Sequence, residues 1–278
     1  MTTKTFLVIG GTGKTGRRVV SQLRARGESV RAASRHGEQR FDWSDESTWD
    51  AALDGVHGVY VTPLDGSTAA PRFFERAATA GVERVVLLSA RGVDVPGYYG
   101  DGDVESMLAN ETALRASGPQ WTILRPGWFA QNFSEGIFRA GILAGELRQA
   151  AGEGAASFVD TGDIAAVGVA AVTEDGHAGE VYELSGPRAV TFEEATAEIG
   201  AATGKPVKYV ALPPAEFVEE LAGQGWSEAD AGMWTAGLSP IARGLEAKIS
   251  DGVRRALGRD ATDFSVFVKN AEAENAWG

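Results

Sequence analysis

The stretch Thr5-Phe-Leu-Val-Ile-Gly-Gly-Thr-Gly-Lys-Thr-Gly-Arg-Arg18 joins an apolar run to a glycine cluster and then to a helical pattern. We expect residues 6–9 to form a buried parallel strand, and Val19 and Leu23 to line the inner face of the following helix. The glycines would allow a tight turn and a close approach of the backbone to an anion, beside the free N–H groups of the helix N-terminus. Their spacing therefore predicts a dinucleotide-binding turn at Gly10, Gly13, Lys14, Thr15 and Gly16.

Two other interpretations of this turn are open. Gly13-Lys14-Thr15 resembles the end of a nucleoside triphosphatase P-loop, but that motif needs a glycine where this chain has Val8. A turn that binds no nucleotide is disfavoured, because this turn opens an alternating series of strands and helices. Arg17 and Arg18 lie in the first turn of the expected helix, where cations oppose the helix dipole, and this predicts a compensating anion nearby.

The 278 residues contain no cysteine and three scattered histidines, and the net charge is −12. This length predicts an NADP-binding domain over residues 1–132, to whose sheet later segments can return, and a mainly substrate-binding and lid region over 133–278. A metal site is not expected, and the negative charge opposes binding to nucleic acid or membranes. Without a long apolar run or a signal segment, we expect a soluble, cytoplasmic protein that acts on a small molecule.

Ser34 and Arg35 follow the second expected strand, about twenty residues after the glycines. Turns that prefer NAD place an acidic residue there, whereas a guanidinium suits the 2′-phosphate of NADP. The alternative is an arginine that only faces solvent. We therefore expect NADPH as the cofactor, with Asp42 and Trp43, at the end of a third strand expected over 40–43, placed to hold the adenine.

Two further strands are expected over 57–61 and 84–88, and they end in Thr62-Pro63 and Ser89-Ala90. Ligands of doubly wound sheets lie beyond the carboxyl ends of the strands, so these residues are candidates for the nicotinamide side. Capping a helix or bonding within a loop is the commoner role of such hydroxyl groups. The long loop 91–103 follows, and its Tyr98 is a second candidate hydrogen-bond donor beside Ser89.

A sixth expected strand, over 121–124, leads into Arg125-Pro-Gly-Trp-Phe129 and Gln131-Asn132. Together with the glycine turn, Phe41-Asp-Trp43, Leu87-Leu-Ser-Ala90 and Asp163-Ile-Ala165, this run resembles the NmrA-like atypical short-chain dehydrogenase/reductases. The resemblance spans nearly the whole chain and is closest to the ergot-alkaloid reductase subgroup, which includes agroclavine dehydrogenase and festuclavine synthase, with quinone oxidoreductases as further relatives. It implies a Rossmann-type α/β fold with a doubly wound parallel sheet, a role compatible with secondary metabolism, and NADP contacts from Pro126, Gly127, Trp128 and Phe129.

The chain departs from ordinary short-chain reductases at the proton donor. Those enzymes use a Tyr-x-x-x-Lys pair, whose phenol protonates a developing alkoxide. Asp103 and Met107 stand at the positions that we assign to that pair, and the histidine often present in this segment of the relatives is also absent. We expect hydride transfer to a bulky, apolar carbonyl, imine or iminium, or quinone, assisted by a hydrogen bond from Ser89, Thr62 or Tyr98.

The second half of the chain is expected to hold the substrate. We predict a helix and turn over 135–147, a helix from 164 with Asp163 as its cap, and a capping box at Thr191-Phe-Glu-Glu194. Helices over 228–236 and 241–257 would flank a break at Gly237-Leu-Ser-Pro240, which suits a lid. Such apolar stripes are more often core than pocket. The candidates for the pocket lining are Tyr98, Trp128, Met233, Trp234 and Leu238.

Two other functions are weighed against the reductase. A non-catalytic redox sensor of the NmrA type would bind the dinucleotide and report its state to a protein partner. An ATP-using P-loop protein is disfavoured by Val8 and by Ser89, which stands where a magnesium-binding aspartate is expected. The sequence leaves the identity of the substrate and the oligomeric state open.

Overall fold

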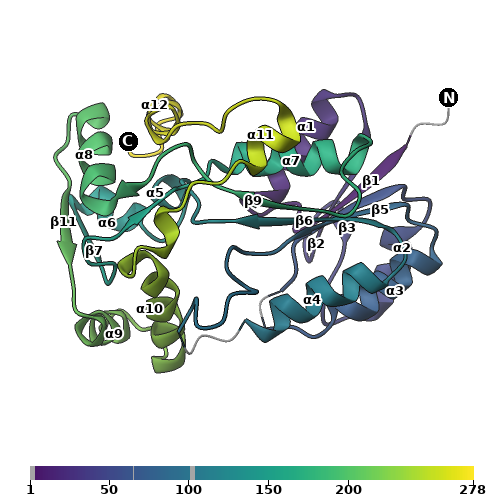
Figure 1. The fold of residues 1–278 in the computed structure, drawn as a ribbon, viewed down its shortest axis with the longest axis horizontal. Helices are drawn as coiled ribbons and strands as arrows, with labels where there is room; N and C mark the ends of the chain where they lie inside the picture. Colours follow the sequence, from purple (N-terminus) through teal and green to yellow (C-terminus); the bar gives the residue numbers. More distant parts are fainter. Residues whose placement is uncertain (1–3, 65, 101–103) are drawn as a thin grey trace.

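The computed structural model describes residues 4–64, 66–100 and 104–278. It has two parts, a sheet lobe and a C-terminal lobe, at opposite ends of its long axis (Figure 1). We use sheet lobe for residues 4–131, 160–184 and 248–258, and C-terminal lobe for the remaining residues after 131. Over the described ranges, no helix combines the length and apolar character that crossing a membrane requires.

Within the described residues, seven parallel strands form the main sheet in the order β3-β2-β1-β4-β5-β6-β9. The strand order reverses at β1, which has β2 on one side and β4 on the other. A ligand crevice is expected beyond the carboxyl ends of the strands at this point. The Rossmann-type doubly wound fold is therefore confirmed. The strand bounds are β1 (Thr5–Ile9), β2 (Ser29–Ser34), β3 (Gln39–Arg40), β4 (Gly58–Val61), β5 (Arg84–Leu88), β6 (Gln120–Pro126) and β9 (Glu180–Leu184).

Helices cover both faces of this sheet. Successive side chains of β1 point to opposite faces, and each one from Phe6 to Ile9 is at most 1% exposed. Phe6 and Val8 pack in one core with α1 (Gly16–Ala25), α7 (Thr161–Thr173) and α11 (Gly252–Leu257). Leu7 and Ile9 pack in a second core with α2 (Trp49–Leu53), which follows the short η1 (Glu46–Thr48), and with α3 (Ala70–Thr79) and α4 (Glu105–Ala116). The continuous apolar run of β1 thus reflects burial on both sides.

The C-terminal lobe is built around aromatic side chains. Phe133, Phe138, Phe158, Phe192 and Phe264 are each at most 2% exposed, and the ring centroid of Phe133 lies 5.0–5.7 Å from those of the other four. Tilted and edge-to-face rings at this separation attract one another. The elements of the lobe are α5 (Asn132–Glu135), α6 (Arg139–Ala144), β7 (Glu146–Gln149), β8 (Ala155–Ala156), β10 (Val190–Thr191), α8 (Phe192–Thr203), β11 (Lys208–Ala211), α9 (Pro214–Gly223), α10 (Glu228–Ala242), η2 (Leu245–Ala247) and α12 (Phe264–Ala273).

The predicted break at Gly237-Leu-Ser-Pro240 is wrong. Helix α10 continues through this segment to Ala242. Pro240 lies in the last turn, where the missing N–H removes a single hydrogen bond and little of the helix remains to be disrupted. The single helix predicted over 241–257 is also wrong, because this segment holds the end of α10, the short η2 and the separate α11.

Other predicted elements differ in detail. The helix predicted over 135–147 is divided into α5, α6 and β7, because Gly145, at φ 79°, ends α6 and lets the chain enter a strand that pairs with β11. The third strand is Gln39–Arg40 and stops before Trp43. Asp160, and not Asp163, caps α7 by accepting from the Gly162 N–H at 2.6 Å. The predicted capping box of Thr191 and Glu194 is confirmed.

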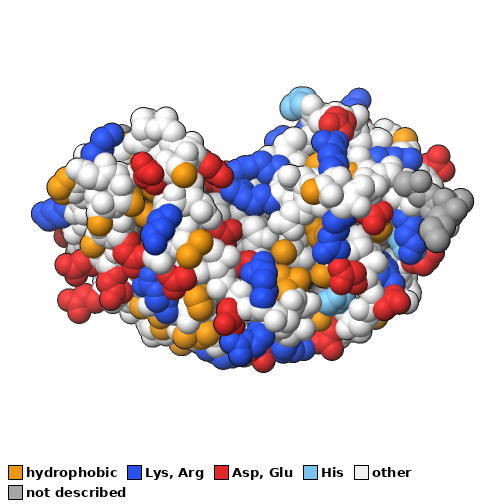
Figure 2. Space-filling view, turned by 90° about the horizontal axis from the view of Figure 1, so that it is seen from above, with side chains coloured by type: hydrophobic (Ala, Val, Ile, Leu, Met, Phe, Trp, Pro, Cys, Tyr) orange, Lys and Arg blue, Asp and Glu red, His pale blue; other side chains and the backbone are white. Residues whose placement is uncertain are grey.

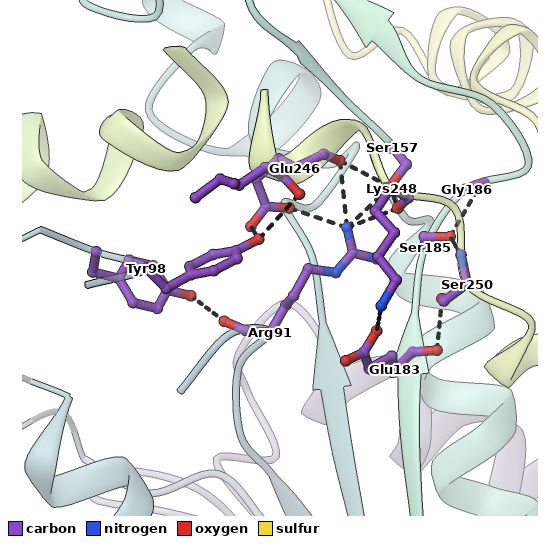
Figure 3. Close-up of polar contacts among 11 residues, drawn as sticks. Arg91, Tyr98, Ser157, Glu183, Ser185, Gly186, Glu246, Lys248 and Ser250 are labelled. Carbon is purple, nitrogen blue, oxygen red and sulfur yellow. Dashed lines mark hydrogen bonds and ion pairs between the residues drawn. The ribbon is translucent and has the colours of Figure 1, made fainter. Parts of the chain in front are cut away.

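A buried ion pair joins η2 to the end of β5 (Figure 3). Arg91 Nη1 lies 3.3 Å from Glu246 Oε2, and the two side chains are 3% and 2% exposed. The Tyr98 hydroxyl donates to Glu246 Oε1 at 2.8 Å, and Arg91 Nη1 donates to Ser157 Oγ at 3.2 Å. Burial raises the pKa of Glu246, while Arg91 and the Tyr98 hydrogen bond counteract that rise. The pair therefore links the C-terminal lobe to the carboxyl edge of the main sheet.

Glu246→Ala is expected to lower the free energy of unfolding by about 3–5 kcal/mol, because it leaves the Arg91 guanidinium buried without a counter-charge. Urea denaturation followed by tryptophan fluorescence measures this change. Lys248→Ala is the control, since the ion pair of Lys248 with Glu183 is exposed and should contribute at most about 1 kcal/mol. Equal losses for the two variants would contradict a special role of the buried pair.

Candidate active site

One side of the glycine turn is tightly packed, and the other side is exposed. Gly10 has φ 75°, and a Cβ on Gly16 would lie 2.1 Å from the Gly10 carbonyl oxygen, so both positions require glycine. Gly13 is exposed, and its N–H donates to the Gly10 carbonyl at 2.9 Å. No side chain of the described residues caps the N-terminus of α1. The exposed side therefore offers unshielded backbone at the positive end of the helix dipole, which is the arrangement that holds a pyrophosphate.

Cationic side chains surround this turn. Arg17 and Arg18 both pair with Glu135 of α5, and Lys14 Nζ donates to Asn132 Oδ1 at 2.8 Å. Glu135 is the compensating anion that the position of the two arginines predicted, so that prediction is confirmed. Burial, and then Arg17 and Arg18, lower the pKa of Lys14, and a bound anion would relieve this repulsion. Seen from above, the molecule is hollowed between its two lobes, and Lys and Arg side chains gather at the wall of the hollow (Figure 2).

Ser34, Arg35 and Asp42 lie at one edge of the sheet lobe, beyond β2 and β3. Arg35 is exposed, and it helps to lower the pKa of Asp42, after the larger effect of the hydrogen bonds from Ser44. Trp43 is half-buried, and its Nε1 donates to the Thr62 carbonyl at 3.3 Å. Its ring meets Phe41 edge to face at 5.0 Å between centroids. The edge therefore combines an exposed guanidinium with an aromatic ring held by a hydrogen bond.

A cavity of about 260 Å³ lies beyond the carboxyl ends of β4, β5 and β6. A Cβ on Gly10 would lie 3.0 Å from the Thr62 side chain, so the cavity adjoins the glycine turn. Of the predicted residues, the structure brings together Thr62, Pro63, Ser89 and Phe129 here, and it adds Leu64, Leu87, Leu88, Ser106, Met107 and Asn110. The lining formed by these described residues contains no ionisable side chain. Met107 faces the cavity, while Asp103 lies outside the described residues.

Ser89 is held by a buried charge network that the sequence analysis missed. Ser89 Oγ donates to Glu111 Oε1 at 2.7 Å, and Glu111 accepts two hydrogen bonds from Arg125 at 2.8 and 2.6 Å. Arg125 also donates to Asp94 at 2.5 Å, and these hydrogen bonds, chiefly the one to Glu111, raise its pKa. The hydroxyl proton of Ser89 therefore points to Glu111, and only its lone pairs are free for a ligand. The sequence carries no local signal of this network, because charged residues are ordinarily exposed and Glu111 and Arg125 lie 14 positions apart.

Tyr98 does not line the cavity of Ser89. Its hydroxyl donates to Glu246, and the residue borders another pocket with Val93 and Leu108. Burial, followed by the charge of Glu246, raises the pKa of Tyr98. Tyr99 is likewise engaged, because its hydroxyl donates to the Arg91 carbonyl at 2.6 Å.

The remaining pocket candidates divide into three environments. Trp128 stacks on Phe138 with 5.8 Å between ring centroids and meets Trp234 edge to face at 5.5 Å. Trp234 Nε1 is buried and has no hydrogen-bond partner in the described part of the chain. Met233 is 68% exposed, whereas Leu238 is 0% exposed in the aromatic core. Trp128 and Trp234 are therefore the two candidates that the structure brings together.

A family profile described as NAD(P)H-binding matches residues 10–175. The chain belongs to the NAD(P)H-binding family. An uncharacterised oxidoreductase of Bacillus subtilis is 34% identical to it over 276 residues, which are 95% of this chain and 93% of the relative. The NAD(P)H azoreductase of Xenophilus azovorans is 34% identical over 286 residues, covering 95% and 96%. An NADPH-dependent quinone oxidoreductase of Escherichia coli superposes with a TM-score of 0.77 at 25% identity, covering 95% and 98%.

The resemblance of this NAD(P)H-binding oxidoreductase to NmrA-like reductases is confirmed. Agroclavine dehydrogenase of Claviceps fusiformis is 28% identical over 294 residues, covering 98% of both chains. NmrA itself, a negative transcriptional regulator, superposes with a TM-score of 0.68 at 16% identity, covering 99% and 98%, and this likeness concerns the fold alone. Binding of NAD(P)H thus rests on the family as well as on the glycine turn.

Gly13→Ala is expected to weaken NADPH binding by at least about tenfold, because the methyl group would stand where the backbone must approach the pyrophosphate. The fold should persist, since the new Cβ would meet only the Gly10 carbonyl, at 3.3 Å. Fluorescence titration with NADPH and thermal denaturation measure the two effects. Gly232→Ala, in open space on α10, is the control and should leave binding unchanged. Unchanged affinity in Gly13→Ala would show that the dinucleotide binds elsewhere.

Proposed function

We propose that the protein is an NADPH-dependent reductase that delivers hydride to a bulky, apolar carbonyl, imine or iminium, or quinone. The observation that carries this proposal is the uncharged cavity beside the glycine turn, lined by Phe129, Met107 and leucines as well as Ser89 and Thr62. Apolar walls with a few polar groups suit an apolar electrophile. The names of two relatives, an azoreductase and a quinone oxidoreductase, describe acceptors of comparable character.

The preference for NADPH over NADH rests on Arg35. This guanidinium is exposed at the carboxyl end of β2 and forms no ion pair with another described residue, whereas Arg40 pairs with Asp45 at 3.2 Å. A 2′-phosphate placed there would gain charge-assisted hydrogen bonds from Arg35 and a further contact from Ser34. We assign the ends of β2 and β3 to the adenosine, and the ends of β4, β5 and β6 to the nicotinamide.

The proposed reaction requires no acid or base among the residues that line the cavity. When bound, NADPH supplies the hydride. The leucines and Phe129 exclude water, and Thr62 lines the cavity next to the glycine turn. Met107 has no ionisable proton. The proton that the product takes up after hydride transfer would therefore come from water. Orientation of the acceptor would then provide most of the rate acceleration, which favours acceptors that stabilise negative charge on their own.

Turnover separates this proposal from a redox sensor. Oxidation of NADPH in the presence of 1,4-naphthoquinone, followed at 340 nm by the standard assay for reduced nicotinamide, is expected for the reductase. Tight NADPH binding without turnover of any quinone, carbonyl, imine or azo acceptor would favour the sensor.

Arg35→Ala is expected to weaken NADPH binding about 10- to 150-fold, because a charge-assisted hydrogen bond contributes about 1.5–3 kcal/mol. Binding of NADH should hardly change, since NADH lacks the 2′-phosphate. Calorimetric titration with both cofactors measures the difference. Arg24 is another exposed arginine, which lies on α1 and pairs with Glu38. Its replacement in Arg24→Ala should alter neither affinity. An equal loss for NADPH and NADH would refute the role of Arg35.

Trp234→Ala is expected to raise KM or lower kcat for a bulky acceptor by about tenfold, with no change in NADPH affinity, if the contact of Trp234 with Trp128 closes the substrate end of the site. Steady-state kinetics and NADPH titration test this expectation. Leu238→Ala on the same helix is the comparison, because Leu238 is buried in the core and should lose stability instead. Unaltered kinetics beside a large fall in Tm would assign Trp234 to the core as well.

A further inference from the structure

The cavity contains a buried amide that nothing in the described structure satisfies. Asn110 lines the cavity, is 3% exposed, and its Oδ1 has no hydrogen-bond partner among the described residues. A buried polar group without a partner is unfavourable, so such a group in a cavity marks a place where a ligand can complete the hydrogen bonding. As placed, this oxygen can only accept a hydrogen bond. Turning the amide about its last side-chain bond puts the NH₂ group in its place, and in that orientation Asn110 can donate.

Asn110 reaches the cavity from the helix that carries the proton donor in ordinary short-chain reductases. It follows Met107 by three positions, so the two side chains lie on one face of α4, and both line the cavity. The next residue, Glu111, takes the proton of Ser89 and is itself held by Arg125. Two neighbouring residues of α4 therefore have different roles. Glu111 engages Ser89, and Asn110 faces the space where a ligand would bind.

We propose that Asn110 is a catalytic residue, whose side-chain NH₂ donates a hydrogen bond to the atom of the acceptor on which negative charge develops. This inference rests on the proposed reductase function. Ser89 has its proton engaged, and Tyr98 is bonded to Glu246 outside the cavity. The buried unpartnered groups in the lining are then the Thr62 hydroxyl and the Asn110 amide, and of these two the amide carries two N–H donors that can act in place of the missing tyrosine. A fixed amide dipole in an uncharged cavity acts where charge forms, and it needs no change of protonation.

The reaction balances without an acid in the protein. A quinone accepts two electrons and one proton as a hydride from NADPH, which becomes NADP⁺, and one oxygen of the quinone becomes anionic. The Asn110 NH₂ stabilises this oxygen, and water then protonates it, so the products are the hydroquinone, NADP⁺ and hydroxide that the buffer neutralises. Asn110 neither gains nor loses a proton.

Asn110→Leu tests the proposal with the full chain, NADPH and 1,4-naphthoquinone. Leucine keeps the approximate size and removes the amide, so kcat should fall about 10²–10³-fold, as it does when one donor to an oxyanion is lost. The NADPH affinity should stay within about twofold, a change too small to indicate a lost contact with the cofactor. The Tm of the ligand-free protein should be equal or rise by about 2–4 °C, because an unsatisfied buried polar group has been removed.

Two further variants test whether the amide acts as a hydrogen-bond donor. Asn110→Asp replaces the donor by an acceptor, so its kcat should fall at least as far as that of Asn110→Leu. Thr112→Val is the matched control, since Thr112 is exposed on α4 and its hydroxyl donates only to the Leu108 carbonyl, and its kcat should not change.

Each other result overturns the proposal in a recognisable way. An unchanged kcat in Asn110→Leu, or a higher kcat in Asn110→Asp than in Asn110→Leu, excludes the donor role. A lower Tm together with the lower kcat assigns Asn110 to the structure, and weaker NADPH binding assigns it to the cofactor. These results leave the reductase function standing. Wild-type protein that binds NADPH but reduces no acceptor overturns the reductase function and this inference together.

Discussion

The contact between the start of α1 and the end of β1 constrains the rest of the structure. Any side chain at position 16 would overlap the Gly10 carbonyl, so the helix can approach the strand this closely only through glycine. That approach directs the helix N-terminus at the ligand crevice, which lies where the strand order reverses at β1. A Cβ on Gly10 would lie 3.0 Å from the Thr62 side chain, so the cavity beyond β4 adjoins the same turn.

Buried carboxylates position the elements around this crevice. Glu111 binds the β6 residue Arg125 and orients Ser89, while Glu246 binds Arg91 and Tyr98. Each carboxylate accepts from an arginine at the carboxyl edge of the sheet and from a hydroxyl group. A buried paired charge tolerates little displacement, because separating it from its partner leaves both groups without solvent or counter-charge. Both networks thus limit the geometry of the loops that surround the cavity.

The sequence predicted those features that depend on local chemistry. The glycine turn, the strands of the main sheet and the Thr191 capping box each follow from residues close together in the chain. The pairing of Arg17 and Arg18 with Glu135 was predicted only as an unspecified anion, because the partner comes from a distant segment. The pairs Glu111–Arg125 and Arg91–Glu246 could not be derived, since a charged residue in a sequence is ordinarily exposed and nothing local indicates its burial.

The errors in the C-terminal half have a similar origin. Pro240 suggested a break, but its effect depends on its distance from the end of α10, which the packing of Leu238 and Ile241 in the aromatic core decides. The strand β7 was hidden in a helical pattern, because its partner β11 lies about sixty residues later and short strands are defined by their pairing. The candidate site shows the same division, since Thr62 and Ser89 were found from strand ends, whereas Asn110 needed its unpaired amide to be seen.

The path of the chain between the two lobes has a consequence for how the protein folds. After α5 and α6 the chain returns to the sheet lobe with α7 and β9, leaves it again for α8 to α10, and returns with α11. A chain that ended at residue 132 would expose the edge of β6 and would lack α7 and α11 on one face of the sheet. The nucleotide-binding half is therefore complete only when most of the chain has been synthesised.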